Sequence, residues 1–324
     1  MDARSLGQKS ECSDFEAEFS PDKADFRRNT TGISRKYDEE PAEIPPKDGR
    51  LGLLSQAPKA IGVFDSGLGG LTTVKRLKEL LPGERIIYLG DTGRVPYGSR
   101  SKETITKYAR QDAAFLAGFD IKAMVIACNT VCSVAFDILE NAYDMPIYEV
   151  VSPPAISAAA LTKNGKIGVI GTNATIRSGA YGAAIKRVAP DMSVISAPCP
   201  LFVPLVENGR VAEDDIAAIT IAEDYLSELR GAGIDTLILG CTHYPLLRNV
   251  IAKVMGRGVM LVDSGAETAK LVAGDIRARG LMAPEGAEGT IEYFVTDSTD
   301  GFSALASVFM EEDICGMVEQ VTLD

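Results

Sequence analysis

The sequence predicts an α/β protein with two similar, doubly wound parallel-sheet domains, related by pseudo-twofold symmetry, and a ligand site in the cleft between them. From Lys59 onward, short apolar runs alternate with amphipathic helical segments, which is typical of parallel sheets. Glycine-containing runs at 61–67 and 167–173 open two comparable halves. Each half also contains an apolar run that ends in a cysteine, Cys128 or Cys241. Because ligands favour clefts between domains, the repeat predicts one site reached from both halves.

The first half is expected to alternate four strands with helices. After the first strand, apolar residues recur at helical spacing from Leu71 to Leu81, and Pro82-Gly83 ends the helix. The expected strands are 60–64, 86–89, 123–127 and 147–150, and the expected helices are 71–81, 101–118 and 130–143. Ser152-Pro153-Pro154 is expected to form the crossover to the second half.

The second half is expected to contain strands near 166–170, 193–197, 235–239 and 259–262. The last part of the chain should add a helix near 265–280, a strand near 290–295 and a final helix, and return to the first domain. The predicted first domain is therefore 59–154 plus 264–324, and the second is 155–263.

Residues 1–58 differ from the rest of the chain. They are rich in charged residues and contain few apolar ones, and prolines gather toward their end. Such a composition cannot bury enough apolar surface to fold by itself. We therefore expect a disordered N-terminal extension.

Composition excludes several classes of protein. The net charge of -12 argues against nucleic-acid binding as a main activity, since phosphate contacts need a basic surface. No apolar stretch approaches the length of a membrane span, and the first twenty or so residues lack the apolar core of a secretory signal. Six cysteines without a dense framework indicate reduced thiols. The expected location is the cytoplasm.

The paired cysteines are the strongest candidates for chemistry. Cys128 and Cys241 each stand where an apolar run ends, and ligands of open α/β sheets gather at that end of the strands. A free cysteine is more often a small buried apolar residue, as we expect for Cys132 on the apolar face of its helix. The matched setting of Cys128 and Cys241, each followed by polar residues, favours a functional role.

Three acidic or basic residues are weaker candidates. Asp65 begins a glycine-rich turn between a strand and a helix, but Asp263-Ser264-Gly265 repeats the pattern and is expected only to cap a helix. His243, the only histidine, stands two residues after Cys241 and could hold the proton of that thiol. Glu207 ends an apolar segment and gains weight only from the resemblance that follows.

Taken together, these motifs resemble those of the glutamate racemase family, within the aspartate/glutamate racemase superfamily. The resemblance covers about residues 60–310 and does not include the N-terminal extension. The matching segments are 62–70, 91–98, 127–130, 167–172, 200–207, 239–247 and 293–297.

The resemblance implies racemisation of glutamate with no cofactor and no metal. Cys128 would remove the α-proton of D-glutamate and Cys241 that of L-glutamate, each as a thiolate, while the other thiol donates a proton from the opposite face. Asp65 would support Cys128, whereas Glu207 and His243 would support Cys241.

The resemblance also implies which residues hold the substrate and which partners exist. The residues that would bind glutamate are Asp65, Ser66, Tyr97, Gly98, Asn129, Thr130, Thr172, Thr242 and His243. The D-glutamate would supply peptidoglycan synthesis, and so cell-wall biogenesis and cell shape. A homodimer and activation by a cell-wall precursor are further expectations.

Three alternatives stay open at the level of sequence. The same fold could racemise another acidic amino acid, aspartate, or a hydantoin. A zinc module could use Cys128, Cys132, Cys241 and His243, although the usual zinc-ligand spacings are missing. The chain could also be an amino-acid sensor without turnover.

Overall fold

A computed structural model describes residues 58–323. The predicted N-terminal extension, 1–58, lies outside the described residues except for Pro58. Among the residues described, no helix is both long enough and apolar enough to pass through a bilayer.

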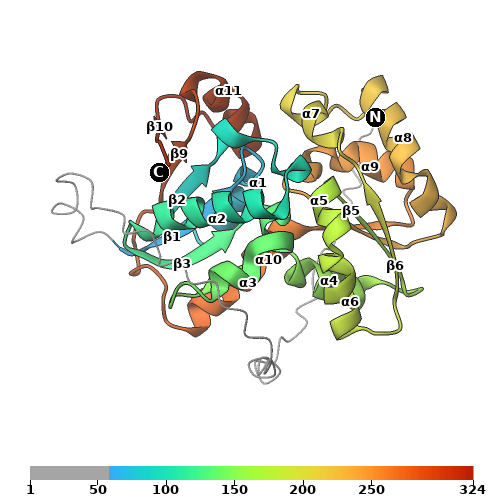
Figure 1. The fold of residues 1–324 in the computed structure, drawn as a ribbon, viewed down its shortest axis with the longest axis horizontal. Helices are drawn as coiled ribbons and strands as arrows, with labels where there is room; N and C mark the ends of the chain where they lie inside the picture. The colour runs from blue at the N-terminus through green and yellow to red at the C-terminus, as the bar shows by residue number, and fades with distance from the viewer. Residues whose placement is uncertain (1–57, 324) are drawn as a thin grey trace, which may run out of the picture. The chain divides into compact units, whose positions relative to one another are not determined.

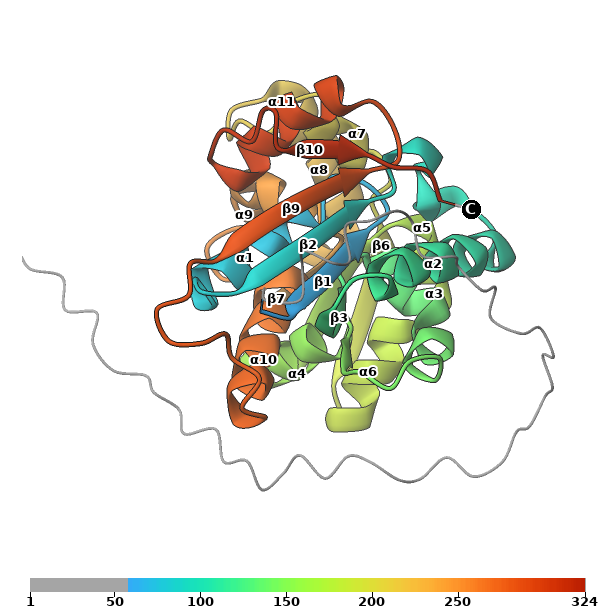
Figure 2. The ribbon, with the colours of Figure 1, turned by 90° about the vertical axis from the view of Figure 1, so that its left-hand side faces the viewer.

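The first sheet has six parallel strands in the order β10-β9-β2-β1-β3-β4. Figure 2 shows β10, β9, β2, β1 and β3 side by side in this order. Every residue of β1, β2 and β3 is buried, as expected for parallel strands covered on both faces. The strands are β1 Ala60–Asp65, β2 Arg85–Gly90, β3 Ile121–Ile126, β4 Ile147–Tyr148, β9 Thr290–Val295 and β10 Val318–Gln320.

The second sheet has four parallel strands in the order β6-β5-β7-β8. Its central strands are apolar after their first residue, and β7 is buried throughout. The strands are β5 Lys166–Gly171, β6 Ser193–Pro198, β7 Thr236–Gly240 and β8 Met260–Asp263. The predicted fold class, α/β with two similar parallel sheets, is confirmed.

The two sheets repeat one topology. In chain order, the strands of each sheet take the spatial order second, first, third, fourth: β2-β1-β3-β4 and β6-β5-β7-β8. The direction in which successive strands are added to the sheet therefore reverses between β1 and β3, and again between β5 and β7. Sheets of this kind bind ligands at such points. Cys128 follows β3 and Cys241 follows β7, so the two cysteines occupy equivalent positions.

Helices cover both faces of the sheets, and strand residues alternate between the two faces. Ile61 and Val63 of β1 join a core cluster that includes α1, α10 and α11, whereas Phe64 joins the cluster of α2 and α3. Figure 1 shows α8 and α9 beside the second sheet. The helices are α1 Leu71–Leu80, α2 Lys102–Ala117, α3 Asn129–Glu140, α4 Ser152–Leu161, α5 Asn173–Ser178, α6 Ala180–Val188, α7 Phe202–Glu207, α8 Ile216–Gly231, α9 Arg248–Met255, α10 Ser264–Ala278 and α11 Thr299–Met310.

Local signals account for most element boundaries, with three differences from expectation. The strand expected at 147–150 is only Ile147–Tyr148, and β10 was not predicted because three residues leave no readable period. The expected crossover at 152–154 is the first turn of α4, where proline is tolerated because its missing N–H has no helical partner. Asp263 caps α10 by accepting from Ala266 N, as predicted.

Candidate active site

Cys128 lies just beyond β3, at the start of α3, and its side chain is almost fully buried. Its Sγ lies 3.4 Å from Ser66 Oγ, to which it donates a hydrogen bond. Burial and, to a smaller extent, the nearby charge of Asp65 raise the pKa of the thiol to about 12, while the Ser66 hydroxyl acts in the opposite direction. Cys128 is therefore a thiol at neutral pH.

Cys241 directly follows β7, and a chain of side-chain contacts leads away from it. His243 Nδ1 lies 4.0 Å from Cys241 Sγ, and His243 Nε2 lies 3.2 Å from Glu207 Oε1. Burial opposes a charged imidazole, but the contacts with Cys241 and Glu207 outweigh it and raise the pKa of His243 to about 10. The predicted neighbours of Cys241 are thus brought together, with His243 between the thiol and the carboxylate.

Asp65 lies between the two cysteine environments. Its Oδ2 accepts a hydrogen bond from Gly67 N at 3.0 Å, and its Oδ1 accepts one from Thr242 Oγ1 at 3.4 Å. Burial raises the pKa of Asp65, and the positive charge of His243 lowers it in part. The expected support of Cys128 is here electrostatic, because the hydrogen bonds of Asp65 go to its own turn and to the second sheet.

Asn129 and Thr130, directly after Cys128, contact the second sheet's helices. Thr130 Oγ1 lies 3.0 Å from Thr172 Oγ1, and Thr172 caps α5 by accepting from Thr175 N. Asn129 Oδ1 accepts from Tyr181 OH at 2.5 Å. The predicted residues Asn129, Thr130 and Thr172 therefore lie where the two halves meet. We call this contact, between residues that follow strands of the first sheet and residues that follow strands of the second, the seam.

Tyr97 belongs to a buried polar cluster that the sequence did not reveal. Its hydroxyl donates to Asp91 and, at 3.0 Å, to Asp112. Arg94 bridges the same two carboxylates at 2.6 and 2.9 Å. The Tyr97 hydroxyl, predicted to contact substrate, thus has other partners in this state. Asp112 was not predicted because a single acid in the middle of α2 resembles any solvated helix residue, and Arg94 because it lies in a loop.

Two glycines bring the backbones together across the seam. A Cβ on Gly98 would lie 2.8 Å from Thr172 Cβ, and one on Gly69 would lie 2.2 Å from Thr242 Oγ1. Such distances leave no room for any side chain, so glycine is required at both positions. The seam is therefore tightly packed at these two points, and both cysteines are buried.

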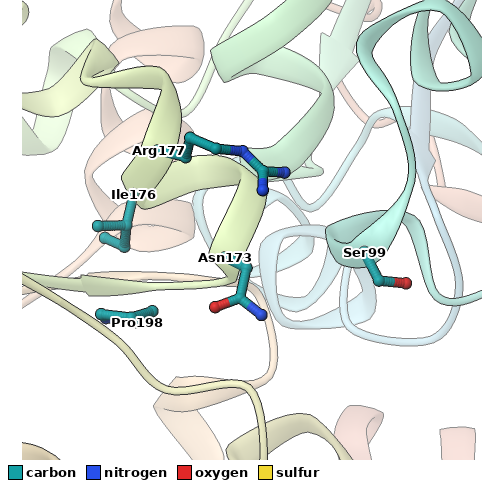
Figure 3. Close-up of a pocket in the computed structure, with 5 residues that line it drawn as sticks. All are labelled: Ser99, Asn173, Ile176, Arg177 and Pro198. Atoms are coloured by element: carbon teal, nitrogen blue, oxygen red, sulfur yellow. The ribbon is translucent and has the colours of Figure 1, made fainter.

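A hollow of about 410 Å³ lies outside the closed seam and is lined by Ser99, Asn173, Ile176, Arg177 and Pro198 (Figure 3). Ser99 and Asn173 directly follow Gly98 and Thr172, the two residues in close contact. Neither this hollow nor a second one beside it is lined by Cys128 or Cys241. The first hollow therefore lies next to the contact between Gly98 and Thr172.

The residues of the zinc alternative do not gather. Within 58–323, no three His, Cys, Asp or Glu side chains are grouped so that they could hold a metal ion. Cys132 donates to Ile126 O at 3.2 Å, inside the core formed by α3 and β3. This contact agrees with the structural role expected for Cys132.

The fold and the two buried thiols define a class of protein. Residues 61–272 match the sequence model of the Asp/Glu/Hydantoin racemase family, and the chain belongs to this family.

The relatives narrow the class. A glutamate racemase of Geobacter metallireducens is 49% identical over 266 residues, which are 82% of this chain and 97% of the relative. The Francisella tularensis glutamate racemase, solved with D-glutamate, is 38% identical with a TM-score of 0.76 over 82% of this chain and 98% of that one. The Escherichia coli glutamate racemase, solved with L-glutamate and the activator UDP-MurNAc-ala, is 28% identical with a TM-score of 0.67 over 82% of this chain and all of that one.

Proposed function

We propose that this chain interconverts L- and D-glutamate through two cysteine bases and without a cofactor, Cys128 and Cys241 acting from opposite faces of the α-carbon. The observation that carries this proposal is the placement of the two thiols after equivalent strands of two sheets with one topology. Similar groups delivered from two sides suit a reaction whose substrate and product are mirror images.

In the D-to-L direction, the Cys128 thiolate removes the α-proton and the Cys241 thiol donates its own proton to the opposite face. The electron pair left on the α-carbon forms the new C–H bond, so the reaction leaves Cys128 protonated and Cys241 as thiolate. In the L-to-D direction the roles are reversed. Because burial and Asp65 disfavour a thiolate at Cys128, the positive ammonium of the bound substrate is what makes that thiolate accessible.

His243 and Glu207 act on the Cys241 side. A thiolate at Cys241 and an imidazolium at His243 stabilise each other, and Glu207 orients the ring through Nε2. Asp65 and Ser66 act on the Cys128 side. The Ser66 hydroxyl accepts a hydrogen bond from the thiol, and the Asp65 carboxylate acts through its charge.

The remaining residues of the site hold glutamate once the seam opens. The hydroxyls of Ser66, Thr130, Thr172 and Thr242 and the amide of Asn129 suit the two carboxylates and the ammonium. Gly98 offers backbone, and Tyr97 holds the loop that carries Gly98. Fixed dipoles in a closed, dry site would stabilise the carbanion that develops at the α-carbon.

The test is racemisation followed by circular dichroism, with exchange of the α-proton in D₂O followed by NMR. Wild-type protein should invert both enantiomers, whereas Cys128→Ser and Cys241→Ser should lose at least about 100-fold in rate, as expected when one acid–base group is removed. Slow exchange without inversion should persist for L-glutamate in Cys128→Ser and for D-glutamate in Cys241→Ser. Cys132→Ser, at an equally buried position outside the site, is the matched control.

Two results would contradict the proposal. Wild-type rates in both serine variants would remove the two thiols from the mechanism. Inversion of aspartate or a hydantoin with glutamate inert would move the substrate to the alternative. The relatives named glutamate racemase at 44–49% identity do not favour that alternative.

The biological setting extends this proposal. The D-glutamate would serve peptidoglycan synthesis in the cytoplasm, a compartment that suits the free buried thiols. A homodimer is expected, and light scattering would test it. The activator bound by the Escherichia coli enzyme supports a similar response here, so UDP-MurNAc-ala should raise turnover. Residues 59–154 plus 264–324 and residues 155–263 would form the two domains that part to admit glutamate.

A further inference from the structure

Two neighbouring hollows outside the seam share a basic lining. Arg177 lines both, and Arg100 and Lys102 line the second, which has a volume of about 430 Å³. Figure 3 shows the Arg177 side chain extending from α5 toward the segment that carries Ser99. We call Arg100, Lys102 and Arg177 the basic vestibule.

The charge of the vestibule contrasts with that of the chain. The chain carries a net charge of -12, yet these three cations are accompanied by a single acid in the lining, Glu103. Within the part of the chain that the structure describes, none of the three forms an ion pair. The lining therefore has an excess of positive charge on an acidic protein, with Glu103 beside Lys102 as its single acid.

The vestibule lies next to the contact between Gly98 and Thr172. Ser99 and Asn173 of the first hollow are each one residue from the closed contact between Gly98 and Thr172. Behind that contact, Thr172 lies 3.0 Å from Thr130, two residues beyond Cys128. Opening the seam at Gly98 would connect the first hollow with the Cys128 thiol.

We propose that the basic vestibule is a docking subsite for a carboxylate of the amino-acid substrate, and that Arg177 captures this carboxylate before the seam opens. The inference rests on the proposed function and adds the route by which an acidic substrate reaches the thiols. A guanidinium matches a carboxylate with two parallel hydrogen bonds, so Arg177 can orient the ligand as well as attract it.

The physical need for the vestibule follows from the net charge. Glutamate carries a net charge of about -1 at neutral pH, and a protein of charge -12 repels it at long range. A concave patch of one sign focuses the field and can raise association rates by about 10-fold to 1000-fold. Because salt screens charges beyond about 10 Å at 0.1 M, the effect of the vestibule should fade as ionic strength rises.

The experiment measures kcat and KM for both enantiomers from about 10 mM ionic strength, where the Debye length is about 30 Å, to about 500 mM, where it is well below 10 Å. For Arg177→Gln, we expect kcat/KM at low salt to fall about 10-fold through KM, with kcat within about twofold of wild type, which is the pattern of lost uniform binding. Arg177→Glu should lose more and Arg177→Lys less. Arg100→Gln and Lys102→Gln should each lose about two- to threefold. The matched control, Arg257→Gln, changes the net charge equally at an exposed position that lines neither hollow.

Three outcomes are distinguishable. A KM increase that shrinks with salt in the vestibule variants, but not in Arg257→Gln, supports the inference. Unchanged KM and unchanged salt dependence in Arg177→Gln and Arg177→Glu, while the wild type racemises glutamate, overturn the vestibule and leave the proposed function standing. A wild-type protein that does not racemise glutamate overturns the proposed function and this inference with it.

Discussion

The surroundings of Cys128 and Cys241 differ, although the two cysteines occupy equivalent positions in sheets of the same topology. Near Cys128 the polar groups are a hydroxyl, Ser66, and a buried carboxylate, Asp65, and the pKa of the thiol is raised. Near Cys241 the neighbour is His243, whose pKa is raised to about 10 and which is held by Glu207.

Two sheets of one topology thus give their cysteines different electrostatic neighbours. Burial and the charge of Asp65 keep Cys128 protonated, whereas Cys241 lies beside His243, whose own pKa is raised. Under the proposed mechanism, abstraction from D-glutamate needs the Cys128 thiolate, and the ammonium of a bound substrate would make that thiolate more accessible.

One thermodynamic constraint governs every test of this asymmetry. Enantiomers have equal free energies in solution, so kcat/KM must be equal in the two directions for every variant. A change on one side therefore lowers both values together. The side that was weakened is identified by the deuterium isotope effect, which is largest for the enantiomer whose proton is removed in the slowed step.

The largest effect is expected for His243→Asn. Loss of the imidazole removes the partner of Cys241 and should lower kcat/KM in both directions by about 100-fold to 1000-fold. The isotope effect should increase for α-deuterated L-glutamate and decrease for α-deuterated D-glutamate. Equal isotope effects for the two enantiomers would show that His243 does not act on the Cys241 side alone.

A smaller effect of opposite sense is expected for Asp65→Asn. Removing the carboxylate should lower kcat/KM by about 10-fold to 100-fold and raise the isotope effect for α-deuterated D-glutamate. Because the charge of Asp65 raises the pKa of Cys128, the variant should also shift the acidic limb of the kcat profile for D-glutamate, where the base loses its proton, to lower pH. A shift to higher pH would contradict the electrostatic role.

Glu207→Gln is expected to change the racemisation rate and also the pH dependence of the unfolding free energy. The activity should fall about 10-fold, since a positioning carboxylate contributes less than the group it orients. A His whose pKa is raised from 6.5 to about 10 adds stability that is complete below about pH 6.5 and is lost as the pH rises through 10. The difference in unfolding free energy between wild type and Glu207→Gln should therefore be largest near pH 6 and shrink toward pH 10.

The control for this comparison is Glu213→Gln, which changes an exposed carboxylate outside the site. Urea unfolding at several pH values gives the free energies. A difference between wild type and Glu207→Gln that is constant from pH 6 to 10 would mean that the carboxylate does not act through His243.

The smallest effect on the difference between the two cysteine sites is expected for Tyr97→Phe. The hydroxyl bridges buried Asp91 and Asp112, so its loss should cost about 1–3 kcal/mol of unfolding free energy. Both isotope effects should stay as in wild type. Tyr143→Phe is the control, because the Tyr143 hydroxyl bonds to no other described residue. A strong isotope asymmetry in Tyr97→Phe would place its hydroxyl at the substrate.

The fold and the two thiols were predictable because their signals are local. Alternating apolar runs predicted the strands, and each cysteine was visible at the end of one such run. The cluster of Arg94, Tyr97 and Asp112 was not predictable, because its members come from a loop and from the middle of a helix and meet only after packing. The edge strand β10, next to the expected β9, is too short to carry a pattern.

The amino-acid sequence by itself determined the repeated topology and the strand ends at which Cys128 and Cys241 stand, since hydrophobic period and turn residues act over a few neighbours. Only the tertiary structure decided which groups meet across the seam. Segments far apart in the chain meet where Gly98 approaches Thr172 and where Thr242 donates to Asp65. The basic lining around Arg177 likewise combines residues from two distant segments. Burial at that seam then shifts the pKa values, and burial is a property of the packed molecule.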